Sequence, residues 1–237
     1  MTAYAVAFRD FIAGYANDAA HTPGEQATEE YTGAGHVHHG ISVPDMRTFL
    51  GDWLTEHKSS LSYDDWVVTL DTLYRGESVE EKMMAGMLIA KFPRYQKQLP
   101  LTRLDTWLDQ LHGWMEVDTT CQAVFKDKVL LADWDGWQMF LRGLATNSNI
   151  NKRRASLVFL VQPVRKPEKR FVELALELVD QLKHEDNKLI TKAISWVLRE
   201  SVKQHKADIN TYLDANEDSL PAIAVRETHK KLATGKK

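Results

Sequence analysis

The chain has 237 residues, of which 43% are hydrophobic and 27% are charged, a balance typical of a folded globular protein. No apolar run approaches the roughly 20 residues that a membrane span requires, so we expect no membrane association. The single cysteine, Cys121, excludes an internal disulfide and thiolate metal clusters. Arg9 and Asp10 interrupt the first apolar stretch, which argues against a signal peptide. The lone cysteine favours a reducing, bacterial-type cytoplasm.

The net charge of −3 conceals an asymmetry between the two halves of the chain. Residues 1–118 hold 9 Lys and Arg against 18 Asp and Glu, whereas residues 119–237 hold 21 against 15. Residues 152–206 alone hold 13 basic and 7 acidic side chains. A basic half on an acidic whole predicts an anionic partner such as nucleic acid or a phosphorylated surface. The alternative is a chance distribution over a solvated helical surface.

Apolar residues recur with the period of an α-helix along almost the whole chain, as in Leu157, Leu160 and Val161. Sustained alternation of apolar and polar residues is absent, so no strand is predicted. Ser62 with Asp65 resembles a capping box, and Pro44 suits the first turn of a helix. The helical pattern breaks at residues 21–24, 33–44, 59–62, 93–100, 133–136, 147–151, 163–167 and 184–187.

About a dozen helices joined by short polar loops predict an all-α fold, either a helical solenoid or a large bundle. The paired rhythm of segments from residue 62 onward favours stacked helix–turn–helix repeats. The repeats are too dissimilar in sequence to assign a period. Because no low-complexity linker divides the chain, we predict one domain over residues 1–237, with a less regular N-terminal part over residues 1–43.

The common catalytic signatures GxxxxGK[ST], GxGxxG, GxSxG and HExxH do not occur. Phosphoryl transfer, dinucleotide redox chemistry, serine hydrolysis and zinc proteolysis therefore have no sequence support. His36, His38 and His39, with His21 nearby, do not have the spacing of metal ligands. They indicate a loop with partly exposed histidines, and we expect neither a metal nor a cofactor.

The segment 188–206 places a tryptophan and three cations on one helical stripe: Lys192, Trp196, Arg199 and Lys203 stand at i, i+4, i+7 and i+11. Lysine and arginine can hold phosphates, while an indole offers a flat surface to a sugar or base. The alternative, equally compatible with the pattern, is a half-buried tryptophan under basic side chains whose charged ends reach solvent.

Two further features have the residue types of a nucleic-acid site. Trp114 and Asp118 are four residues apart, so an indole and a carboxylate share one helical face. Arg153 and Arg154 open another helix after a polar loop, where a phosphate can also meet free backbone N–H groups.

Three motifs occur in an order and at spacings that resemble the AlkD-type DNA alkylation repair glycosylases: W-x-x-x-D at 114–118, R-R-A at 153–155 and K-A-I-x-W-x-L-R-E at 192–200. Tyr31, followed by the segment 40–47, is similar to the entry motif of that family, and the resemblance spans residues 28–233. It implies HEAT-like repeats that form an α-solenoid with a concave DNA-binding face. It also implies hydrolysis of the N-glycosidic bond of cationic N3- and N7-alkylated purines in duplex DNA.

These residues suit that reaction. An alkylated purine leaves as a neutral base, so no general acid is needed, and a single carboxylate can stabilise the oxocarbenium-like sugar and orient water. Asp118 is the candidate for this role, with Trp114 and Trp196 as aromatic partners for the cationic sugar and base. The resemblance assigns DNA contacts to Arg154, Arg153, Arg199, Lys203, Lys192 and Arg47, and places Tyr31 in the cleft. Residues 33–39 depart from the family pattern.

The sequence therefore predicts a monofunctional alkylpurine DNA glycosylase, active as a monomer without a cofactor. Two alternatives remain open. A non-catalytic DNA-binding paralogue would keep the arginines without needing Asp118. A helical-repeat scaffold for a protein partner would expose an apolar patch where a glycosylase has a basic cleft.

Overall fold

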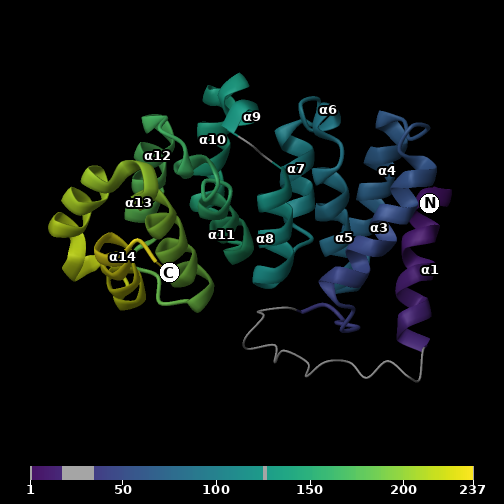
Figure 1. Ribbon diagram of the computed structural model, residues 1–237, viewed down its shortest axis with the longest axis horizontal. Coiled ribbons are helices and arrows are strands. Elements are labelled where there is room, and N and C mark those ends of the chain that lie inside the picture. The colour runs from purple at the N-terminus through teal and green to yellow at the C-terminus, as the bar shows by residue number, and fades with distance from the viewer. Residues whose placement is uncertain (1, 18–34, 125–126, 237) are drawn as a thin grey trace. The chain divides into compact units, whose positions relative to one another are not determined.

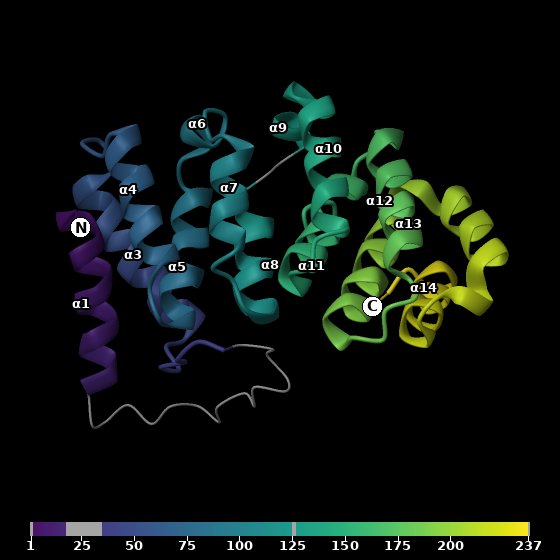
Figure 2. The same cartoon turned by 180° about the vertical axis from the view of Figure 1, so that it is seen from behind.

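The structure is a computed structural model that describes residues 2–17, 35–124 and 127–236. Within these residues it contains thirteen α-helices and two short 3-10 helices, and no strand. The β-type pairing found there is one isolated bridge between Val37 and Ser78. The prediction of an all-α fold is confirmed (Figures 1 and 2).

The chain divides into two compact units, an N-terminal unit over Met1–Val124 and a C-terminal unit over Phe125–Lys237. Because residues 119–124 carry no charged side chain, the division coincides with the charge asymmetry of the sequence. The N-terminal unit has a net charge of −9 and the C-terminal unit of +6. The single domain expected over residues 1–237 stays a prediction, and each unit is described by itself.

The N-terminal unit begins with a regular helix within the part expected to be less regular, and residues 35–42 then run without a helix. Its helices are α1 (Ala3–Asn17), α3 (Val43–His57), α4 (Tyr63–Tyr74), α5 (Val79–Ala90), α6 (Pro93–Gln96), α7 (Leu101–Leu108) and α8 (Gly113–Val124).

Serine side chains start three of these helices. Ser62 Oγ accepts the backbone N–H of Asp65 at 3.0 Å, which confirms the cap predicted for α4. Pro44 lies in the first turn of α3, as expected. Sequence reasoning missed the complete capping box of α5, in which Ser78 and Glu81 each satisfy a backbone N–H of the other.

The C-terminal unit contains α9 (Asp127–Ala132), α10 (Trp134–Ala145), α11 (Ile150–Val158), η1 (Pro163–Arg165), α12 (Lys169–Leu182), α13 (Lys188–Asn216), η2 (Glu217–Ser219) and α14 (Ala222–Thr234). Side chains of Asp133, Asn149 and Asn187 cap α10, α11 and α13 at breaks that the sequence predicted. α13 is kinked at His205, whose backbone is not helical.

Nine of the helices alternate along the chain as first and second members of pairs. First helices α3, α5, α8, α11 and α13 begin at residues 43, 79, 113, 150 and 188, which are 34 to 38 residues apart. Second helices α4, α7, α10 and α12 begin at residues 63, 101, 134 and 169, which are 33 to 38 residues apart. The helical-repeat prediction is confirmed, with a period near 35 residues that the sequence did not reveal.

Each unit buries its own aromatic core. In the N-terminal unit, Trp107 stacks on Tyr74 with ring centroids 5.0 Å apart and meets the fully buried Trp66 edge-on at 6.4 Å. In the C-terminal unit, Trp137 packs against the buried Phe159 at 5.6 Å. Such pairs add about 0.5–1.5 kcal/mol to the stabilisation from burial, so the repeats hold their helices at fixed positions.

Candidate functional site

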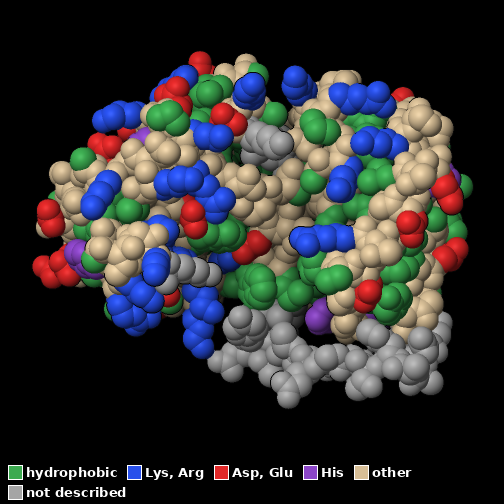
Figure 3. Space-filling view, viewed as in Figure 1, with side chains coloured by type: hydrophobic (Ala, Val, Ile, Leu, Met, Phe, Trp, Pro, Cys, Tyr) green, Lys and Arg blue, Asp and Glu red, His purple; other side chains and the backbone are tan. Residues whose placement is uncertain are grey.

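A groove of about 630 Å³ runs along the first helices of three successive repeats, α3, α5 and α8, in the N-terminal unit. Contacts of α5 with both α3 and α8 place the three helices side by side (Figure 1). Its apolar lining includes Val43, Leu50, Met83 and Met87. On the face seen in Figure 3, hydrophobic side chains gather over the lower part of α5 and α8, with Lys and Arg side chains above them.

Trp114 and Asp118 both line this groove. They stand one turn apart on α8 and are half-buried, as the four-residue spacing predicts. The groove therefore presents an indole face and a carboxylate to the same space. Its apolar surroundings strengthen electrostatic interactions with any charge that enters, because the effective dielectric constant there is lower than in water.

Two cations line the same groove. Arg47 projects from α3 and Lys91 follows the end of α5, and both side chains are exposed. Among the residues that the structure describes, neither has an ion-pair partner. Arg47 was predicted as a DNA contact, whereas Lys91 was missed. No local pattern in the sequence indicates Lys91, because it joins the groove only through the packing of α5 against α3.

The predicted stripe of Lys192, Trp196, Arg199 and Lys203 lies on α13 in the C-terminal unit, before the kink. Lys192 and Lys203 are exposed, while Trp196 and Arg199 are half-buried. The guanidinium of Arg199 forms an ion pair with Glu227 at 3.2 Å and donates to the carbonyl of Ser195. One part of the stripe therefore faces solvent while another is held by neighbouring side chains.

Arg153 and Arg154 lie in the first turns of α11, as the sequence predicts. Arg153 donates to both carboxylate oxygens of Glu185, at 2.8 and 3.0 Å, and to the carbonyl of Asn147. Arg154 is 4% exposed and donates to the carbonyl of Leu189. Both guanidinium groups therefore contribute to the packing of the C-terminal unit.

The remaining sequence predictions concern the N-terminal part. Tyr31 and His21 lie outside the described residues. His36, His38 and His39 lie in a segment without a helix, and none is fully exposed. Where the structure describes the chain, no three His, Cys, Asp or Glu side chains are grouped to hold a metal ion, and no helix is long and apolar enough to cross a membrane.

The fold is that of an all-α helical-repeat protein. Its groove, along the first helices of three repeats, is lined by an indole, a carboxylate and two cationic side chains. A family model for the DNA alkylation repair enzymes matches residues 18–232. The chain belongs to that family, as the resemblance of its motifs indicated, and the family is one of DNA repair.

One solved structure, a predicted DNA alkylation repair enzyme from Enterococcus faecalis, is similar to this chain with a TM-score of 0.69 and 16% sequence identity. The match covers 98% of this chain and 95% of that one. At this identity the likeness concerns the fold. No curated protein matches the chain.

Proposed function

We propose that this protein is a DNA glycosylase that hydrolyses the N-glycosidic bond of cationic N3- and N7-alkylated purines in duplex DNA. The observation that carries the proposal is the groove, in which Trp114 and Asp118 share the space with Arg47 and Lys91. Membership of the DNA alkylation repair enzyme family supports it.

The proposed reaction needs few groups because the substrate already carries a positive charge. The electron pair of the glycosidic bond moves to the purine nitrogen, so the base leaves neutral without protonation by the enzyme. The sugar then approaches an oxocarbenium ion, which a nearby carboxylate stabilises. Asp118 takes this role. It also accepts a hydrogen bond from the water whose oxygen bonds to the anomeric carbon, and the proton of that water passes to the carboxylate or to solvent.

Aromatic faces complete the proposed chemistry. Trp114 lies one turn from Asp118, and an indole attracts a cation over its face by about 0.5–2 kcal/mol. Trp196, half-buried on α13, is proposed as a second aromatic contact for the cationic sugar or base.

Duplex DNA binds, in this proposal, mostly through its phosphates. Such contacts position the duplex without reading its sequence, and they weaken as salt rises. Exposed Arg47 and Lys91 in the N-terminal unit and exposed Lys203 in the C-terminal unit suit this role best. The family resemblance adds Lys192, Arg199, Arg153 and Arg154.

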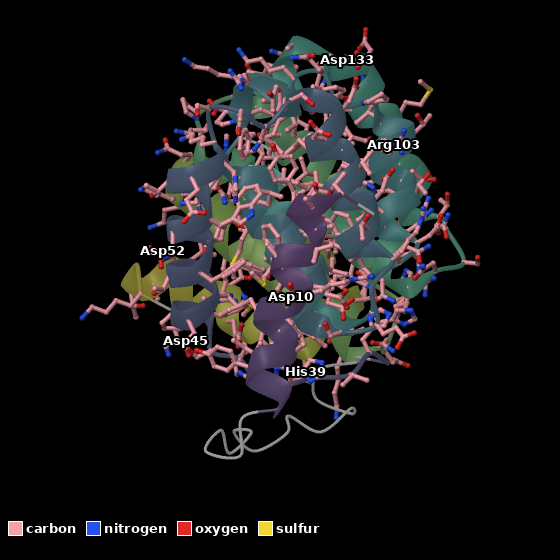
Figure 4. The ribbon with its side chains drawn as sticks, turned by 90° about the vertical axis from the view of Figure 1, so that its right-hand side faces the viewer. Asp10, His39, Asp45, Asp52, Arg103 and Asp133 are labelled. Atoms are coloured by element: carbon pink, nitrogen blue, oxygen red, sulfur yellow. The ribbon has the colours of Figure 1, made fainter. Side chains whose placement is uncertain are left out.

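The decisive experiment measures release of N7-methylguanine from a duplex oligonucleotide with enzyme in excess and EDTA present. The wild-type protein is expected to release the free base and leave an abasic site. Asp118→Asn keeps the shape of the side chain but removes its charge, so the rate should fall roughly 10²–10³-fold. The matched control is Asp52→Asn, at an exposed carboxylate of α3 that does not line the groove (Figure 4).

Binding to undamaged duplex should be the same in Asp118→Asn and wild type, because phosphates do not contact that carboxylate. Equal release rates for Asp118→Asn and Asp52→Asn would remove Asp118 from the mechanism. A wild-type protein that binds duplex but releases no base from several alkylated substrates would be the non-catalytic binder. A protein that does not bind duplex even at low salt would be the protein-binding scaffold.

A further inference from the structure

Residues 35–41, here called the strap, run without a helix beside the start of α5. Val37 donates its N–H to the carbonyl of Glu77 at 3.0 Å and accepts the N–H of Val79 at 2.9 Å. The Val37 side chain is 56% exposed. The side chains of His36 and His38 are less exposed, at 19% and 26%, and face the protein.

Both histidines contact carboxylates that are completely buried. His36 Nδ1 lies 2.9 Å from Glu116 Oε1 on α8, and His38 Nε2 lies 3.5 Å from Glu80 Oε1 on α5. Each glutamate is 0% exposed. Burial of a carboxylate without polar partners is strongly unfavourable, so the contacts with His36 and His38 help to stabilise Glu116 and Glu80 in the folded protein. His39 lines a pocket together with Val37 and residues of α1, beside the lower end of that helix (Figure 4).

Glu116 also fixes the start of α8. Its second oxygen, Oε2, accepts the backbone N–H of His112 at 2.7 Å. Gly113 follows with a φ of 71°, in the left-handed region that favours glycine. The carboxylate therefore joins the strap on one side to the turn by which the chain enters α8 on the other.

The position of Glu116 on α8 places it behind the groove. Each helical residue rotates by about 100°, so a residue two positions away points to nearly the opposite side. Glu116 is two residues from Trp114 and two from Asp118, both of which line the groove. It holds the helix from its buried face while the other two side chains face the groove.

We propose that His36 is a positioning residue for this groove. Acting through Glu116, it fixes the first turns of α8 and with them the placement of Trp114 and Asp118. This inference rests on the proposed glycosylase function for its catalytic consequence, but the placement of α8 is measurable without activity.

The test uses three variants of the full chain. The contact requires a proton on Nδ1 of His36, because the other neutral tautomer would face the carboxylate with a lone pair. His36→Asn places an amide N–H near the position of Nδ1 and should preserve the contact, whereas His36→Ala removes it. The control is His229→Ala in α14, which removes a solvent-exposed pair with Glu217 at 3.6 Å.

Two readouts separate positioning from general stability. Amide hydrogen exchange over residues 112–118 of the free protein should be faster in His36→Ala, and close to wild type in His36→Asn and His229→Ala. Single-turnover base release should fall roughly 10- to 100-fold in His36→Ala, since a misplacement of about 1 Å can cost 10²-fold. The affinity for undamaged duplex should stay unchanged.

The proposal is overturned if His36→Ala matches His229→Ala in both exchange and release, or if His36→Asn behaves like His36→Ala. If the wild-type protein releases no base, the proposed function fails, and the exchange measurement alone decides the positioning role. If His36→Ala does not fold, Glu116→Gln replaces it. The amide oxygen can still accept from His112 but binds His36 less strongly, so faster exchange supports the proposal and unchanged exchange overturns it.

Discussion

The groove of the N-terminal unit and the arginines of the C-terminal unit differ in how their cations are paired. In the N-terminal unit, with a net charge of −9, the groove exposes Arg47 and Lys91, and neither has an ion-pair partner among the described residues. In the C-terminal unit, with a net charge of +6, most arginines that the structure shows in contacts are paired with glutamates. A basic unit is therefore not by itself a surface that can bind phosphates.

The arginines of the C-terminal unit form a series of contacts one repeat apart. Three ion pairs, each between 2.6 and 2.8 Å, join residues that are 32 to 35 positions apart in the sequence: Arg142–Glu177, Arg153–Glu185 and Arg165–Glu200. This separation equals the repeat period, so each pair joins one repeat to the next. Part of the excess positive charge in residues 152–206 is therefore used in contacts between repeats, and only the remainder is available to an anionic partner.

The largest effect is expected for Arg154, which is 4% exposed and so more deeply buried than the three paired arginines. Arg154→Met leaves the Leu189 carbonyl without this donor, which should lower the free energy of unfolding by roughly 1–3 kcal/mol. The control Arg165→Met removes a half-exposed pair, worth about 0–1 kcal/mol. Urea unfolding measures both, and equal losses would show that burial does not distinguish the two arginines.

The next largest effect is on the salt dependence of DNA affinity. It compares the removal of two cations that have no ion-pair partner with the removal of two that are paired with glutamates. Arg47→Ala combined with Lys91→Ala should reduce the slope of log affinity against log salt by about 1.8, that is, about 0.9 for each of two phosphates. The control, Arg142→Ala with Arg165→Ala, removes the same net charge from paired side chains and should change the slope little. Equal changes in a salt titration would mean that net charge, and not pairing, governs binding.

The smallest effect concerns His112, whose partly exposed ring lies 4.6 Å from that of His36 in the strap, measured between ring centroids. Partial burial lowers its pKa below the ordinary value of 6.5, and His36 lowers it further while Glu116 opposes the shift. The unfolded chain therefore takes up this proton first as pH falls below about 6.5. Stability is lost from there down to the folded-state pKa.

The melting temperature of His112→Gln should consequently fall less between pH 7 and pH 5.5 than that of the wild type. The control His229→Gln should follow the wild type. An identical loss in His112→Gln and wild type would contradict a lowered pKa in the folded protein.

Much of the local structure could be predicted from the sequence. Helix periodicity, the cap at Ser62, the placement of Pro44 and the shared face of Trp114 and Asp118 all depend on residues within one or two helical turns. Spacing along the chain fixes such relations, because the geometry of an α-helix is constant. The charge asymmetry, too, coincided with the division into two units.

Only the tertiary structure decided which helices share a site and which cations are available. Arg47, Met83 and Trp114 meet in one groove although each lies in a different repeat, and His36 meets Glu116 across 80 positions of sequence. Such contacts depend on how first helices pack against one another, which no local pattern encodes. For the same reason the sequence alone could not distinguish Arg47 from Arg153. In the folded protein Arg47 is exposed in the groove, whereas Arg153 forms an ion pair with Glu185.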